Sequence, residues 1–294
     1  MIRKVVIAAA GLGTRLLPAT KEQPKEMLPV FAPGSNEWEG SKPLLKPLLQ
    51  LVLEQLCDVG LTHFCFVIGR GKRAIEDHFT QDESFLATLR NRGKDDLALV
   101  LEGFYERLQG SKIVWVNQPE PKGFGDAVLK ARPCVGDEDF LVVAGDSYVI
   151  SRGNAHLKRL MKSFYEFEAD ALLVTQKIED PRQHGIIEFE ELGDGVLKVK
   201  RAIEKPEEPT SNMAILPFYA FRPVIFEALE KTRLGKGGEM QLTDGIQTLI
   251  DWGLKVYAIQ LNSDEVRLDI GNPQTYWEAL ILSHEHATGN KAQF

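Results

Sequence analysis

The sequence predicts an α/β fold with a Rossmann-like, mixed but mostly parallel sheet that is covered by helices on both faces. Segments rich in β-branched and aromatic residues alternate along the chain with segments whose apolar residues recur at helical spacing. Alternating strands and helices favour a parallel sheet. Several strand-like segments are continuously apolar, which is typical of strands buried on both sides.

The individual elements follow from these patterns. The predicted strands are residues 4–9, 63–69, 112–118, 140–146, 171–178, 213–221 and 255–261. The predicted helices are residues 43–60, 154–168, 223–232, 240–253 and 273–289. The first helix carries an apolar stripe and ends at a glycine, as helices often do. The stripe consists of Leu45, Leu48, Leu49, Val52, Leu53 and Leu56.

The middle of the sequence departs from this alternation. Residues 185–206 resemble a β-hairpin with Gly193 and Gly195 at its turn, so we expect a small antiparallel β excursion that projects from the sheet edge. Residues 32–43 have the composition of a surface loop. No segment has the composition of a linker, and 294 residues fit one large domain.

The composition excludes several classes of function. The net charge is −7 and both signs are interspersed, so no basic surface for a nucleic-acid backbone is expected. No apolar run approaches the roughly 20 residues that cross a membrane. Cys57, Cys65 and Cys134 have no metal-binding spacing, so we expect reduced core thiols in a cytoplasmic protein. A protein that acts on small molecules fits this composition better.

The first predicted strand leads into a loop rich in glycine, proline and basic residues, with the sequence GLGTRLLPATKEQPKEMLP at 11–29. A dinucleotide fingerprint would need a third glycine where Leu16 stands, which disfavours a dehydrogenase. A P-loop would need Gly-Lys followed by Ser or Thr. A glycine turn whose N–H groups face an anion remains, beside the alternative of an ordinary turn with solvated basic residues.

The order of motifs resembles that of sugar-1-phosphate nucleotidylyltransferases, and the loop just described is the first of them. The others, in order, are residues 71–79, 118–131, 145–150, 184–189, 204–206, 211–215, 237–244 and 268–273. A helical spacer at about residues 82–110 favours the uridylyltransferase branch over the thymidylyltransferase branch.

This resemblance implies transfer of a uridylyl group from UTP to glucose-1-phosphate, with release of pyrophosphate and with Mg²⁺ as cofactor. The attacking phosphate is already an anion, so the reaction needs cations, backbone donors and a metal rather than a nucleophilic side chain. The alternatives are a thymidylyltransferase, an enzyme for another hexose-1-phosphate and a non-catalytic nucleotide-sugar-binding protein. We expect no nucleic-acid or membrane partner, and a homo-oligomer, either dimer or tetramer.

The resemblance also divides the single domain of residues 1–294 into parts. It implies a nucleotide-binding part at about 1–150, a sugar-phosphate-binding part at about 151–272 and a C-terminal helix at about 273–289. That helix carries an apolar stripe that fits either the core or a subunit contact. The stripe consists of Trp277, Leu280, Ile281 and His284.

On the nucleotide side, the resemblance implies that Ala10, Gly11 and Gly13 supply backbone contacts. It implies that Gln118 reads the base, since a glutamine amide offers both a donor and an acceptor. Gly123 would allow a close approach to the base. From the residues alone, Gln118 would more often be an ordinary polar residue at a strand end.

The resemblance also implies which groups carry out the reaction. Arg15 and Lys25 would hold the triphosphate and its developing charge. Asp146 follows an apolar strand, where open α/β sheets place their sites, and would bind Mg²⁺. The alternative for Asp146 is a turn or capping residue. Asp269 would be the second carboxylate on the metal.

On the sugar side, the resemblance implies that Glu204 accepts hydrogen bonds from glucose hydroxyls and that Lys205 contacts the sugar phosphate. Gly185 would allow a close backbone approach. Asn212 and Glu239 are implied as further sugar contacts. A Glu-Lys-Pro tripeptide is by itself usually a solvated strand end.

The sequence also departs from the family pattern. Residues 33–44 resemble an insertion of about a dozen residues. Asp126 stands where a histidine is common, His184 where a tyrosine is common and Pro217 where a glycine is common. The first two departures lie on the nucleotide side and concern base preference, while His184 and Pro217 concern sugar selectivity.

Overall fold

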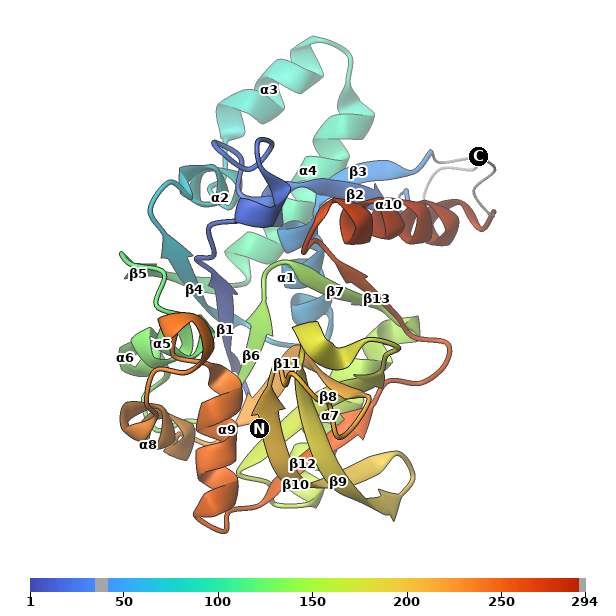
Figure 1. Ribbon diagram of the computed structural model, residues 1–294. Helices are drawn as coiled ribbons and strands as arrows, with labels where there is room; N and C mark the ends of the chain where they lie inside the picture. Colours follow the sequence, from blue (N-terminus) through green and yellow to red (C-terminus); the bar gives the residue numbers. More distant parts are fainter. Residues whose placement is uncertain (35–41, 291–294) are drawn as a thin grey trace.

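The computed structural model describes residues 1–34 and 42–290 and has a central mixed sheet with helices packed against it (Figure 1). Most of the predicted loop at 32–43 lies outside the described residues. Nine strands form the sheet, in the order β5-β4-β1-β6-β11-β8-β12-β10-β9. They are β1 (Lys4–Ala9), β4 (His63–Gly69), β5 (Lys112–Gln118), β6 (Phe140–Ala144), β8 (Ala171–Lys177), β9 (Gly185–Gly193), β10 (Val196–Glu204), β11 (Met213–Phe221) and β12 (Val256–Gln260).

The prediction that the sheet is mostly parallel was wrong. The pairs β5–β4, β4–β1, β1–β6 and β8–β12 are parallel. The pairs β6–β11, β11–β8, β12–β10 and β10–β9 are antiparallel. A continuously apolar strand shows that it is buried but not which way it runs, so the reversed strand β11 was not visible in the sequence.

The hairpin of β9 and β10 exists, with its turn at Gly193–Gly195 as predicted, but it does not project from the sheet edge. β10 pairs with β12, and β9 turns back to pair with β11 between Ile186 and Ala214. This part of the sheet therefore closes into a barrel-like shape. Ile186 and Ile187 point to opposite sides of β9 and are both fully buried, which explains why the hairpin stays within the fold.

Ten α-helices are described. They are α1 (Leu48–Asp58), α2 (Arg73–His78), α3 (Glu83–Asn91), α4 (Asp95–Gln109), α5 (Phe124–Lys130), α6 (Arg132–Val135), α7 (Ala155–Glu166), α8 (Val224–Lys231), α9 (Leu242–Asp251) and α10 (Pro273–Thr288). Alternate residues of β1 pack into two different hydrophobic clusters. Val5 and Ile7 join residues of α1, α4 and α7, whereas Val6 joins residues of α5, α8 and α9.

The predicted helices are present, with one correction at the start of α1. Leu45 was placed on the helical stripe but lies in a short strand, β3 (Leu44–Pro47), which pairs with β2 (Pro29–Ala32). Pro47 explains the difference, because the residue before a proline is disfavoured in a helix. The helix accordingly begins at Leu48.

A second two-stranded ribbon joins distant parts of the chain. It pairs β7 (Ser147–Ile150) with β13 (Val266–Asp269), and neither strand was predicted. Four-residue strands carry too little periodicity to be recognised. The cysteines are free thiols, but Cys57 and Cys134 are half-buried and only Cys65 belongs to the core as predicted. No helix within the described ranges is long and apolar enough to span a membrane.

Candidate functional site

Two adjoining cavities lie where several sheet strands end. The first, which we call the turn-side cavity, has a volume of about 370 Å³ and is bordered by residues 10–14, Gln118 and Gly123. The second, the hairpin-side cavity, has a volume of about 1080 Å³ and is bordered by residues from β9, β10, β13 and α10. Lys25 and Asp146 line both cavities. The two cavities therefore meet at this pair.

The wall of the turn-side cavity is a tight turn after β1. Gly13 has a φ of +67°, in the left-handed region that favours glycine. The Thr20 hydroxyl donates to the Gly13 carbonyl at 2.7 Å and holds the turn closed. At Gly11 an added Cβ would lie 3.8 Å from Lys25 Cε, so the lysine stem passes directly over the glycine.

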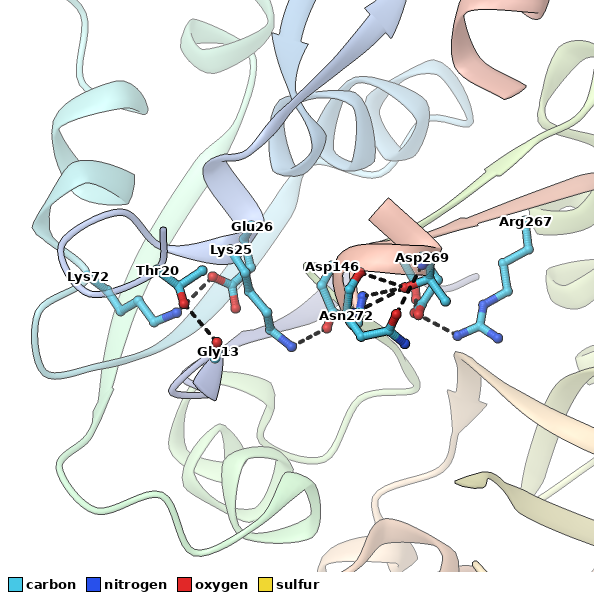
Figure 2. A network of polar contacts seen from close by, with 12 residues as sticks. Gly13, Thr20, Lys25, Glu26, Lys72, Asp146, Arg267, Asp269 and Asn272 are labelled. Carbon is cyan, nitrogen blue, oxygen red and sulfur yellow. Dashed lines mark hydrogen bonds and ion pairs between the residues drawn. The ribbon is translucent and has the colours of Figure 1, made fainter. Parts of the chain in front are cut away.

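Lys25 forms an ion pair with Asp146, which follows β6 (Figure 2). Burial opposes charge on the Lys25 ammonium, but Asp146, Glu26 and Asp269 outweigh it and raise the pKa of Lys25 above its ordinary value. Burial likewise opposes charge on Asp146, but Lys25 and then Arg267 outweigh it and lower the pKa of this carboxyl. Both groups are therefore held in their charged forms at the junction of the cavities.

The β7–β13 ribbon brings the second carboxylate to this place. Asp269 pairs across the ribbon with Ser147, and the backbone N–H of Ile270 donates to the Asp146 carbonyl at 3.0 Å. Arg267 donates from Nη2 to Asp269 Oδ1 at 2.8 Å (Figure 2). Residues two apart on a strand share a face, so Arg267 and Asp269 act on the same side. Arg267 was missed because β13 was not predicted.

Glu26, which follows Lys25 in the sequence, forms a second ion pair. Lys72 Nζ and Glu26 Oε2 are 2.8 Å apart, and both side chains are buried. Burial outweighs the nearby lysines and raises the pKa of Glu26. Lys72 precedes α2, so the pair joins this helix to the loop that carries Lys25. The motif at 71–79 contained Lys72, but nothing in the sequence indicated its partner.

Gln118, at the end of β5, is held beside the start of α5. Its Nε2 donates to the Gly123 carbonyl at 3.1 Å and to Asp126 Oδ2 at 2.7 Å. Gly123 has a φ of +106°, and a Cβ there would lie 2.5 Å from the Met240 carbonyl oxygen. Only glycine fits this position. The sequence identified Asp126 as a departure but not as the partner of Gln118.

In the hairpin-side cavity, Glu204 at the end of β10 accepts a hydrogen bond from the Thr243 hydroxyl at 2.7 Å. A Cβ at Gly185 would lie 2.8 Å from Thr243 Oγ1, so this glycine allows the close approach. Lys205 Nζ lies 3.3 Å from Glu204 Oε1. Lys205 also has a φ of +42°, and such strained residues are concentrated at functional sites.

The structure thus brings together nearly all the predicted site residues. Those at the turn-side cavity are Ala10, Gly11, Gly13, Lys25, Gln118, Gly123, Asp146 and Glu239. Those at the hairpin-side cavity are Arg15, Lys25, Asp146, Gly185, Glu204, Lys205, Glu239 and Asp269. Asn212 is not among the lining residues of either cavity and lines a separate surface depression with residues 179–182 and 207–211, so the structure does not bring it together with the others.

The comparisons with known proteins agree with this geometry. The model of the nucleotidyl transferase family matches residues 4–285. The chain belongs to this family. The UTP–glucose-1-phosphate uridylyltransferase of Pseudomonas aeruginosa is 36% identical over 290 residues, which cover 97% of each chain. The enzyme of that name from Bacillus subtilis is 39% identical over 252 residues, covering 84% of this chain and 80% of the relative.

Solved structures are also similar to this nucleotidyl transferase. A UDP-glucose pyrophosphorylase complexed with UDP-glucose has a TM-score of 0.83 and 29% identity, covering 99% of this chain and all of the other. The UTP-bound UGPase from Acinetobacter baumannii has a TM-score of 0.83 and 28% identity, covering 97% and 94% of the two chains. The similarity extends over both cavities, because it spans nearly the whole chain.

Asp146 and Asp269 are the residues that could hold a divalent metal ion. Mg²⁺ is usually held by one or two carboxylates together with water and substrate phosphate oxygens. Asp146 and Asp269 meet that description, since both line the hairpin-side cavity and Asp146 also lines the turn-side cavity. Within residues 1–34 and 42–290, no group of three or more His, Cys, Asp or Glu could hold a metal alone.

Proposed function

We propose that this nucleotidyl transferase transfers a uridylyl group from UTP to glucose-1-phosphate and releases pyrophosphate. The observation that carries the proposal is the Lys25–Asp146 pair at the junction of the two cavities. One cavity is bordered by a glycine turn with a buried glutamine, and the other by Glu204 and Lys205. Two substrates bound in these cavities would meet at this ion pair.

The reaction requires no covalent intermediate. A phosphate oxygen of glucose-1-phosphate attacks the α-phosphorus of UTP, a new P–O bond forms, and the bond to the pyrophosphate oxygen breaks with its electrons leaving on pyrophosphate. The protein must hold two polyanions in line and offset the charge that develops between them. Fixed cations and backbone donors serve this purpose, because they need no reorganisation during the reaction.

The turn-side cavity would hold the nucleotide. The backbone N–H groups near Gly11 and Gly13 would face the phosphates, and Gln118 would face the base beside Gly123. Lys25, together with Arg15 from the hairpin-side cavity, would hold the triphosphate where the cavities meet. Lys25 would leave Asp146 for a phosphate oxygen once the substrates are bound, since each charge is then matched by a substrate or metal charge.

Asp146 and Asp269 would hold Mg²⁺, which supplies charge neutralisation at the phosphate oxygens when it is bound. Arg267 keeps Asp269 in place through its hydrogen bond. In the hairpin-side cavity, Glu204 would accept hydrogen bonds from glucose hydroxyls and Lys205 would contact the sugar phosphate. Gly185 and Glu239 would complete the sugar contacts.

The assembly and location of the enzyme stay predictions. An apolar groove on the surface supports self-association as a dimer or tetramer, and it combines the loop after β1 with α10. The groove is lined by Leu16, Leu17, Pro18, Ala19, Pro273, Tyr276, Trp277 and Leu280. Sedimentation equilibrium would test this expectation. Fractionation of cells would test the expected cytoplasmic location.

The proposed function is tested by measuring pyrophosphate release from a panel of nucleoside triphosphates crossed with a panel of sugar-1-phosphates, with and without Mg²⁺. We expect the fastest release with UTP and glucose-1-phosphate, and a loss of release when Mg²⁺ is chelated. Faster release with TTP would favour a thymidylyltransferase, and faster release with another sugar phosphate would change the assigned hexose. Binding of UTP without any release would contradict the enzyme assignment.

A further inference from the structure

The carboxamide of Gln118 is held on one side by two protein acceptors. Its Nε2 donates to the Gly123 carbonyl at 3.1 Å and to Asp126 Oδ2 at 2.7 Å. An amide nitrogen carries two hydrogens, so both are used. Gln118 and Asp126 are only 4% and 8% exposed, so water competes little for these bonds.

Asp126 permits only one orientation of the Gln118 side-chain amide. A carboxylate only accepts hydrogen bonds, and so does a backbone carbonyl. If the amide of Gln118 were flipped, its oxygen would face Asp126 Oδ2 and the Gly123 carbonyl with no hydrogen between them. Buried polar atoms left in that state are costly. The amide nitrogen therefore faces Asp126, and the amide oxygen is left for another partner.

The amide oxygen of Gln118 is accessible from the turn-side cavity. Gln118 lines that cavity together with Gly11, Gly13 and Gly123. In the part of the chain that the structure describes, Gln118 Oε1 is not one of the buried side-chain atoms that lack a hydrogen-bond partner. No described protein donor reaches this oxygen either, so it is free to accept a hydrogen bond from a ligand in the cavity.

We propose that Asp126 is a positioning residue that sets base selection through Gln118. With the amide fixed, Oε1 accepts a hydrogen bond from a ring N–H, such as N3–H of uracil or thymine. Cytosine has an acceptor at N3, so it would oppose Oε1 with a second lone pair. A site built around one hydrogen bond rejects the base that lacks the donor. The inference rests on the proposed function, since that function assigns a nucleotide base to this cavity.

The test compares two variants of Asp126 with a matched control. Asp126→Ala removes the acceptor and lets the amide turn either way. Asp126→Asn keeps the shape but can itself offer either an oxygen or an amide group. Asp251→Ala is the control, because Asp251 accepts from Gln247 Nε2 at 2.7 Å in an equivalent contact on the exposed side of α9. Thermal unfolding checks that each variant is folded.

Dissociation constants for UTP, TTP and CTP are measured by titration calorimetry, with kcat and KM for UTP alongside. Asp126→Ala should weaken UTP and TTP binding about tenfold or more and reduce the UTP-to-CTP preference, because hydrogen bonds to charged groups contribute about tenfold to 100-fold. Asp126→Asn should be intermediate. KM for UTP should rise much more than kcat falls. Asp251→Ala should leave the preference unchanged.

The outcomes separate this inference from the proposed function. If the unaltered enzyme releases pyrophosphate from UTP but both Asp126 variants keep the full preference for UTP over CTP, the inference is overturned and the function stands. If the preference collapses in the variants but the unaltered protein releases no pyrophosphate, the inference stands and the function is overturned. If the unaltered protein binds none of the three nucleotides, both are overturned.

Discussion

Lys25 and Glu26 are neighbours in the sequence, yet they form ion pairs in opposite surroundings. Lys25 and Asp146 line both cavities, with side chains 15% and 19% exposed. Glu26 and Lys72 are 2% and 7% exposed. In Asp146 the neighbouring cations outweigh burial and lower the pKa, whereas in Glu26 burial outweighs the cations and raises it. The Lys25–Asp146 pair therefore presents charges that a ligand in the cavities can reach. The Glu26–Lys72 pair is enclosed by the protein and has a structural role.

This difference teaches what decides the role of an ion pair. A buried pair contributes little net stability but is costly to break, because the remaining charge has no partner. A pair beside a cavity can exchange its protein partner for a ligand charge. The predictions below test this division, beginning with the largest expected effect.

Lys72→Met should lower the free energy of unfolding by about 3 to 5 kcal/mol, because the Glu26 carboxylate loses its partner inside the protein. Urea denaturation measures the loss. Adding Glu26→Gln to the same chain should recover part of it, since no unpaired charge then remains. A double variant that is no more stable than Lys72→Met would contradict the structural role of this pair.

Asp146→Asn should reduce pyrophosphate release by about 100-fold or more, because a charge placed at the reacting phosphates is lost. Its free energy of unfolding should change less than that of Lys72→Met. Asp77→Asn is a control, since Asp77 is an exposed carboxylate that does not line either cavity and that pairs with Arg73 at 3.7 Å. Turnover of Asp146→Asn close to that of the control would remove Asp146 from the reaction.

Lys205→Ala should raise KM for glucose-1-phosphate about tenfold and change KM for UTP much less, because a charged hydrogen bond to one substrate is lost. Steady-state kinetics with each substrate varied in turn measures both values. Lys200→Ala is the matched control on β10, where Lys200 pairs with Glu190 at 2.6 Å on the surface. An unchanged KM for glucose-1-phosphate would remove Lys205 from the sugar site.

The smallest expected effect concerns pH. The pKa of Lys25 is raised from 10.5, so its stabilisation is present below that pH and is lost as the pH rises through the folded-state value. The pKa of Asp146 is lowered from 3.8, so its stabilisation is present above that pH and is lost as the pH falls through the folded-state value. Between these limits the contribution of the pair should be constant.

Urea denaturation of the unaltered protein and of a Lys25→Met, Asp146→Asn double variant tests this expectation. The difference in their unfolding free energies should be constant from about pH 5 to about pH 9. It should begin to shrink as the pH rises above 10.5, in the direction of lower stability for the unaltered protein. A difference that stays the same at every pH above 10.5 would contradict the raised pKa of Lys25.

Much of the fold and of the site could be predicted, and the failures have physical causes. Strands such as β1 and β4 were recognisable because each is a nearly continuous run of apolar residues, many of them β-branched or aromatic. The direction of β11 was not, because it depends on pairing with β6 and β8, far away in the sequence. The closure of β9 onto β11 depends on a contact of the same kind.

The candidate site shows the same contrast between local motifs, which could be recognised, and contacts between distant segments, which could not. Lys25 and Asp146 could be named because each lies in a motif of the family that the sequence resembles, and the structure places them in contact. Arg267 was not, because β13 is a four-residue strand that forms only by pairing with β7. The contacts of Glu26 with Lys72 and of Gln118 with Asp126 join side chains whose meeting depends on tertiary packing. Local sequence shows which residues carry charge but not which charges meet.

The β7–β13 ribbon has a consequence for the order in which the protein is made. Asp146 lies near the middle of the chain, whereas Asp269 lies close to its end. A growing polypeptide therefore contains the glycine turn after β1, Lys25 and Asp146 long before the second carboxylate exists. Contacts this distant in sequence form late, because the intervening chain must first be ordered. During synthesis, Asp269 can reach its place beside Asp146 only when β13 joins β7.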